Sequence, residues 1–181
     1  MKYLCLFILL FHISMSMQAQ DYVREIDKKT GQVLLRGQVS FDEIADETSC
    51  QWLYDGAKDY MPNEGITEQL NRMWGNYQFV VFMGTWCEDT RMLLPAFYKT
   101  LLMSGVDMHA VKMYGVDRNK EALNIEHQLY NISRVPTIII MHQYREVGRI
   151  VESVDGTIEE TLLAIIEKDY MKLQAERAAK Q

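Results

Sequence analysis

The residues best suited to chemistry are Cys87 and Thr90, three positions apart in the segment WCEDT at positions 86–90. A thiolate attacks disulfide sulfur, so an accessible cysteine can form a mixed disulfide with another thiol compound. Cys87 stands between an apolar run and a helical pattern, where unpaired backbone N–H groups and the helix dipole favour an anion. Thr90 follows one helical turn later, within reach of the sulfur. The pattern predicts one attacking thiol with a hydroxyl neighbour.

The elements around this pair follow from apolar periodicity. The run FVVFM at 79–83 is typical of a strand buried on both faces. After Cys87, apolar residues recur every three or four positions, which predicts a helix kinked at Pro95. A strand over 108–116 and a helix over 120–130 are expected next.

The C-terminal half is predicted to add two strands and a helix. Strand 137–141 is entered through Pro136, and strand 146–152 follows it. Thr157 and Glu160 have the spacing of a capping box, which marks the start of a long final helix. The order strand, helix, strand, helix, strand, strand, helix predicts a mixed sheet with helices on both faces.

This arrangement resembles the thioredoxin superfamily over about residues 76–166, through WCxxT after a strand and Val135-Pro136-Thr137 before another. The resemblance implies an α/β thioredoxin-like fold, with a mixed central sheet flanked by helices and an N-terminal extension. It also implies that Cys87 is the nucleophile and that Pro136 is cis and faces it. Trp86 would shield the thiol, and backbone groups of Val135 would pair with an extended substrate.

Three departures from thioredoxin bear on the chemistry. Thr90 replaces the resolving cysteine, so no disulfide can form within the motif, and an outside thiol or another cysteine must release a mixed disulfide. Val81 stands where thioredoxins carry a buried aspartate. Glu88 and Asp89 replace glycine and proline and place two carboxylates beside the sulfur.

The chain divides into four expected parts. Residues 1–19 combine a basic start, a short apolar run and small residues, which is typical of a cleavable secretory signal; export would place the protein in the periplasm or cell envelope of a bacterium. Residues 20–75, with a strand or hairpin arm at 33–39 and helices near 41–58 and 65–74, are predicted to be an extension packed on the core. Residues 76–168 form the thioredoxin-like domain, and 169–181 a charged helix end or tail.

Composition and charge exclude several classes of function. A net charge of -6 with interspersed signs argues against nucleic-acid partners. The apolar run near the N-terminus is shorter than the roughly 20 residues that span a bilayer, so no membrane span is expected in the mature form. The four histidines have no metal-ligand spacing, and no metal or cofactor is predicted. Cys50 is interpreted as a buried apolar residue, with a resolving role as the alternative.

Two functions compete at the sequence level. The first is thiol-disulfide exchange through Cys87 with protein thiols, protein disulfides or mixed disulfides. The second is a redox-inactive binding module that holds peptides or proteins in the groove beside Val135 and Pro136. A peroxide-reducing thiol ranks below both, since Arg91 is the only nearby arginine after the motif.

Overall fold

The computed structural model describes residues 21–180, so the predicted signal at 1–19, with Cys5, lies outside the described residues. One six-stranded sheet has the strand order β1-β2-β4-β3-β5-β6. β3 and β4 are parallel, and every other neighbouring pair is antiparallel. The strands are β1 (Tyr22–Ile26), β2 (Val33–Val39), β3 (Tyr77–Met83), β4 (Val111–Gly115), β5 (Thr137–His142) and β6 (Arg145–Val151).

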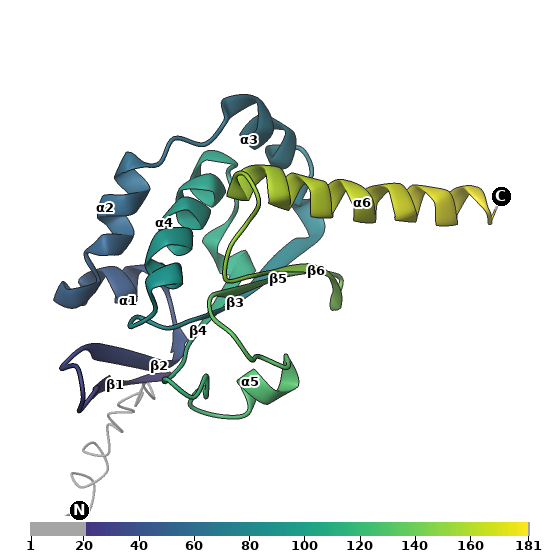
Figure 1. The fold of residues 1–181 in the computed structure, drawn as a ribbon. Coiled ribbons are helices and arrows are strands. Elements are labelled where there is room, and N and C mark those ends of the chain that lie inside the picture. The colour runs from purple at the N-terminus through teal and green to yellow at the C-terminus, as the bar shows by residue number, and fades with distance from the viewer. Residues whose placement is uncertain (1–20, 181) are drawn as a thin grey trace, which may run out of the picture.

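Helices cover both faces of this sheet unequally. Figure 1 shows α1 to α4 and α6 on one side and α5 on the other, with the C-terminal half of α6 extending beyond the sheet. The helices are α1 (Phe41–Asp46), α2 (Trp52–Asp59), α3 (Glu64–Asn71), α4 (Glu88–Met103), α5 (Glu126–Leu129) and α6 (Ile158–Ala178). Short 3-10 turns lie at Thr48–Cys50, Trp74–Asn76 and Met108–Ala110.

The alternation of side chains along β3 creates two apolar clusters. Phe79 and Val81 point into the larger cluster beneath α4 and α6, and Val80 and Phe82 point into the smaller one on the α5 side. Both sets are almost fully buried, as the continuous apolar run predicts for a central strand. This strand leads directly to the predicted nucleophile.

Helices α4 and α6 begin and pack as the sequence indicates. In the capping box of α6, the Glu160 N–H donates to Thr157 Oγ1 at 3.3 Å and the Thr157 N–H donates to Glu160 Oε2 at 3.1 Å. Helix α4 continues through Pro95, whose ring lies against Gly56 of α2. A Cβ on Gly56 would be 2.8 Å from that ring, so only glycine permits this approach.

Two predicted helices were too long. The helix expected over 41–58 is divided into α1 and α2, because the backbone at Glu47 is extended and ends α1. The helix expected over 120–130 shrinks to α5. Asp117 accepts the backbone N–H groups of Asn119 and Glu121, and Lys120 has a φ of +67°, so this stretch is a loop.

The segment before β3 belongs to the same sheet and core. Strand β1, which the sequence analysis did not predict, pairs with β2, and β2 pairs with β4. Ile44, Leu53 and Leu70 lie in the same apolar cluster as Phe97 of α4. From β3 to α6 the predicted order of elements is confirmed, and the chain has a thioredoxin-like α/β fold. Within residues 21–180, no helix is both long and apolar enough to span a bilayer.

Candidate functional site

Cys87 lies at the junction of β3 and α4, as predicted. It is the N-cap residue of α4, with an extended backbone at φ −88° and ψ 130°, and its N–H donates to the Gly84 carbonyl at 2.9 Å. Its side chain is partly exposed. The first turn of α4 carries Glu88 and Asp89, whose carboxylates interact favourably with the positive end of the helix dipole.

The thiol faces the loop that enters β5. Cys87 Sγ donates a hydrogen bond to the Val135 carbonyl at 3.2 Å, and the Val135–Pro136 peptide bond is cis. The Pro136 carbonyl accepts the N–H of Glu152 at 2.8 Å, which ties this loop to the end of β6. The fold therefore brings Cys87, Val135 and Pro136 together across 48 residues of sequence.

Thr90 has a different place from the one expected. Its side chain is fully buried, and Oγ1 accepts the backbone N–H of Gly84 at 3.4 Å. Among the hydrogen bonds of residues 21–180, none joins this hydroxyl to Cys87 Sγ, so the expected contact with sulfur is absent. Thr90 instead ties the first turn of α4 to the end of β3.

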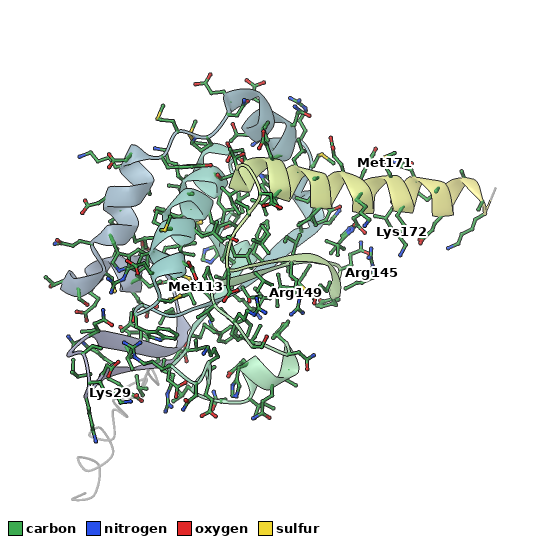
Figure 2. The ribbon with its side chains drawn as sticks, viewed as in Figure 1. Lys29, Met113, Arg145, Arg149, Met171 and Lys172 are labelled. Atoms are coloured by element: carbon green, nitrogen blue, oxygen red, sulfur yellow. The ribbon has the colours of Figure 1, made fainter. Side chains whose placement is uncertain are left out.

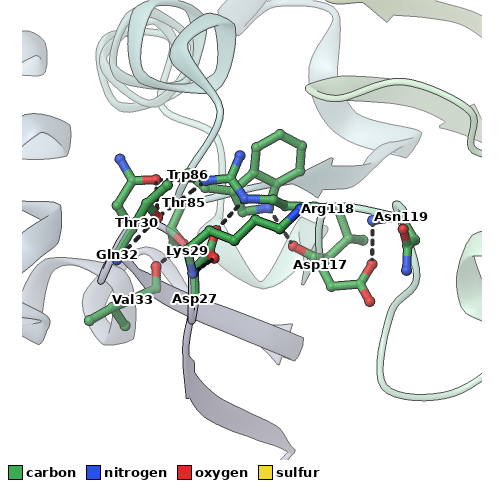
Figure 3. Close-up of polar contacts among 11 residues, drawn as sticks. Asp27, Lys29, Thr30, Gln32, Val33, Thr85, Trp86, Asp117, Arg118 and Asn119 are labelled. Carbon is green, nitrogen blue, oxygen red and sulfur yellow. Dashed lines mark hydrogen bonds and ion pairs between the residues drawn. The ribbon is translucent and has the colours of Figure 1, made fainter.

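Trp86 is held beside the thiol from two directions. Its Nε1–H donates to the Val116 carbonyl at 3.0 Å. Arg118 lies over the indole ring, 5.0 Å from its centroid, and the Lys120 ammonium is 6.0 Å away, both within the range of cation–π contact. Figure 3 shows the Arg118 side chain beside Trp86, with residues of the β1–β2 hairpin on its other side.

Asp27 holds the Arg118 guanidinium over the ring of Trp86, a role that the sequence did not predict. This carboxylate, 8% exposed, accepts from Arg118 Nε and from the Lys29 backbone N–H. The hydrogen bond from Arg118 is the main cause that lowers the pKa of Asp27 to about 2. Arg118 also donates to Gln32 Oε1 at 3.0 Å. Asp27 and Arg118 are 91 positions apart, so their pairing leaves no local pattern in the sequence.

The loop before Cys87 has a second anchor on the same hairpin. Thr85 Oγ1 donates to the Val33 carbonyl at 2.6 Å (Figure 3). Arg91 Nε donates to the Thr85 carbonyl at 3.0 Å, so this guanidinium supports the loop. The β1–β2 hairpin thus positions both Thr85 and Trp86, the two residues that precede the thiol.

Cys50 and Cys87 contact different apolar clusters. Cys50 is 1% exposed and belongs to the larger apolar cluster, whereas Cys87 packs against the smaller cluster on the opposite face. Burial raises the pKa of the Cys50 thiol. Both cysteines are free thiols. This placement fits the interpretation of Cys50 as a buried apolar residue and opposes a resolving role.

Groups of potential metal ligands were sought in the described part of the chain. Between residues 21 and 180, no group of three or more His, Cys, Asp or Glu side chains is arranged to hold a metal ion. The site contains the partly exposed thiol of Cys87, the carbonyl of Val135 and the indole of Trp86, over which the Arg118 guanidinium lies. That combination suits nucleophilic attack by sulfur or recognition of an extended peptide.

Comparisons with known proteins add likeness of fold. No family model matches the chain, and no curated sequence matches it. An HIV epitope scaffold has 18% identity and a TM-score of 0.49, with 72% of this chain and 99% of that chain covered. A protein of unknown function from Pseudomonas aeruginosa has 18% identity and a TM-score of 0.45, with 73% and 90% covered.

Thioredoxin O2 from Arabidopsis thaliana, in its oxidized state, is also similar. The identity is 20% and the TM-score 0.37, with 60% of this chain and 90% of that chain covered. Likeness at these levels concerns fold alone. The assignment of a thioredoxin-like fold rests on the strand order and on the meeting of the α4 entrance with the loop before β5.

Proposed function

We propose that this chain is a thiol-disulfide exchange protein in which Cys87 is a single attacking thiol that acts on protein disulfides or mixed disulfides. The observation that carries the proposal is the partly exposed sulfur at the N-cap of α4, beside the loop that enters β5. Backbone N–H groups at a helix start stabilise an anion, and a partly exposed sulfur is accessible to a disulfide partner.

The exchange step balances without a cofactor. The Cys87 thiol loses its proton to solvent, and the thiolate attacks one sulfur of the substrate disulfide. A new S–S bond forms to Cys87 as the old one breaks, and the other substrate sulfur leaves as a thiolate with the bonding electron pair. A thiol from outside the chain then attacks the mixed disulfide and releases Cys87, because Thr90 cannot and Cys50 is buried.

Reaction and substrate binding are linked at Val135. In the resting site, the Val135 carbonyl accepts a hydrogen bond from the Cys87 thiol. This hydrogen bond is lost when the sulfur ionises and attacks. The freed carbonyl can then accept an N–H from an extended substrate segment, which is a form of strand addition. Trp86 borders the same site and makes cation–π contacts with Arg118 and Lys120.

Export is part of the proposal. The pattern of residues 1–19 is that of a secretory signal, which would deliver the protein to an envelope compartment where protein disulfides persist. Fusing these residues to a reporter enzyme that is active only outside the cytoplasm would test this. A fusion that stays inactive although the reporter is made would reject it.

The function is tested with a glutathionylated peptide and reduced glutathione, by following release of the free peptide thiol. Wild-type protein should accelerate release and Cys87→Ser should not. Cys50→Ser is the matched control and should keep the wild-type rate if it folds, which circular dichroism will establish. Equal rates for the wild type and the folded Cys87→Ser variant, on this substrate and on a protein disulfide, would reject the proposal.

A binding module without turnover is the second candidate, and the resting contact between the thiol and Val135 favours it. In that case the alkylation rate of Cys87 at neutral pH would not exceed that of an unactivated thiol. Peptide binding would survive in Cys87→Ser. Accelerated alkylation together with catalysed release of peptide thiol supports exchange instead.

A further inference from the structure

A cavity of about 460 Å³ lies at the opposite end of the sheet from Cys87. Its walls come from α6, from the segment between α3 and β3, and from the turn between β5 and β6. The residues that matter to its chemistry are Arg72, Met73, Tyr77, His142, Tyr170 and Arg177. Tyr77 starts β3 and Met83 ends it, which places the two sites about 20 Å apart along the strand.

The cavity is positively charged in an acidic protein. Arg72 and Arg177 line it, and none of its lining residues is Asp or Glu. The ion pairs among residues 21–180 include neither Arg72 nor Arg177. Both arginines are solvent-exposed and line the same cavity without carboxylate partners there, so their guanidinium groups are open to a bound anion.

The wall beneath these arginines is fixed by Asp169, which is 4% exposed. This carboxylate accepts from Tyr77 Oη at 3.0 Å, from His142 Nδ1 at 2.6 Å and from Arg145 Nη2 at 2.5 Å. Burial raises the pKa of Asp169, but the hydrogen bonds from Arg145, His142 and Tyr77 outweigh it and hold the pKa below its ordinary value. Its charge is therefore already matched, chiefly by Arg145, which Figure 2 shows beneath the outer half of α6.

The same contacts present an ordered aromatic surface to the cavity. The rings of Tyr77 and His142 lie 4.6 Å apart at an angle of 32°. A carboxylate only accepts hydrogen bonds, so Nδ1 of His142 carries the hydrogen of its contact with Asp169. That leaves Nε2 as the ring atom that can bind a ligand. Met73 and Tyr170 add apolar surface.

We propose that this cavity is a binding site for a small aromatic anion. Its carboxylate or phosphate would be held by Arg72 and Arg177, and its ring would lie against Tyr77 and His142. The volume lies within the range of small-molecule sites, which combine apolar walls with a few placed polar groups. Guanidinium groups pair with carboxylate and phosphate through two parallel hydrogen bonds, which gives direction to the binding.

The test titrates the full chain with phenyl phosphate, inorganic phosphate and phenol, and follows amide and arginine side-chain NMR signals. Phenyl phosphate should bind saturably, should shift signals of the cavity residues, and should bind more tightly than inorganic phosphate or phenol. The double variant Arg72→Gln, Arg177→Gln should bind phenyl phosphate about tenfold or more weakly. Lys172→Gln removes one positive charge from α6 outside the cavity lining and should bind as the wild type does.

Three results would overturn the proposal. The first is the absence of saturable binding of phenyl phosphate. The second is an equal loss in Lys172→Gln and in the double variant, which would mean general attraction to a charged surface. The third is binding in which phosphate alone equals phenyl phosphate, which would leave the aromatic wall without a role. Because Cys87 is not involved, Cys87→Ser should bind phenyl phosphate normally whether or not exchange occurs.

Discussion

Replacing Thr90 with valine removes one hydroxyl and keeps the shape of the side chain. In the structure this hydroxyl accepts the Gly84 N–H at 3.4 Å in a fully buried place, at the position where a resolving cysteine would stand. The substitution therefore separates two roles for Thr90. It either supports the junction of β3 and α4, as the contacts indicate, or it acts on the sulfur of Cys87.

The expected cost follows from that one contact. An unsatisfied buried N–H costs about 1–3 kcal/mol, and the long distance of this hydrogen bond favours the lower end. The extra methyl group recovers part of the cost through apolar burial, about 0.8 kcal/mol at most. We expect Thr90→Val to lower the free energy of unfolding by about 1 kcal/mol, or the melting temperature by about 2–4 °C for a chain of this size.

Thr100 supplies a matched control on the same helix. It is also fully buried, but its Oγ1 has no hydrogen-bond partner in the described part of the chain. Thr100→Val exchanges an unpaired buried hydroxyl for a methyl group and should stabilise the protein by about 1 kcal/mol. Urea unfolding of the two variants should thus show changes of opposite sign.

The second assay is the alkylation rate of Cys87 at neutral pH. Because the hydroxyl bonds the backbone rather than the sulfur, Thr90→Val should leave this rate unchanged. A clear fall in the rate with unaltered unfolding free energy would refute the reasoning, since the hydroxyl would then act on the thiolate. Equal destabilisation by both valine variants would also refute it.

Three further predictions concern the supports of the site. The pKa of Asp27 is lowered to about 2, so its ion pair with Arg118 stabilises the folded state above about pH 4, and this stabilisation is lost as the pH falls towards 2. Asp27→Asn should remove that acid-dependent step from curves of unfolding free energy against pH. Gly115→Ala would place a Cβ 2.0 Å from the Leu35 carbonyl and should cost about 3 kcal/mol or more in urea unfolding, whereas Gly75→Ala, with open space, should cost far less. Peptide mass spectrometry should find Cys50 alkylated only once denaturant unfolds the chain, while Cys87 reacts in the native protein; labelling of Cys50 without denaturant would contradict its burial.

The sequence predicted the elements that carry periodic apolar signals. The run that forms β3, the cysteine at its end and the capping box of α6 are all local patterns, and the structure has each of them in place. The sequence did not predict strand β1, because its side chains are at most partly buried and its apolar and polar residues alternate only weakly. Its place depends on pairing with β2.

The polar contacts were harder to predict, for a physical reason. Asp27 meets Arg118 over 91 positions, and Asp169 meets Tyr77 over 92. Such pairs form only after the sheet and helices are assembled, and charge alone does not indicate which of 25 acidic residues will be buried. In α6, Asp169 is buried at the start of the stretch 169–181, which the sequence analysis describes as a charged helix end or tail.

The pairing of β2 with β4 has a consequence for any shortened version of this protein. Without residues 21–75, β4 would become an edge strand with unpaired backbone groups open to solvent, a template for aggregation. The same truncation would remove the partner of Arg118, Asp27, and the carbonyl of Val33 that accepts the hydrogen bond from Thr85. The half of the chain that resembles thioredoxin thus shares its sheet and its side-chain hydrogen bonds with the β1–β2 hairpin, which is as much a part of the structure as the strand that leads to the cysteine.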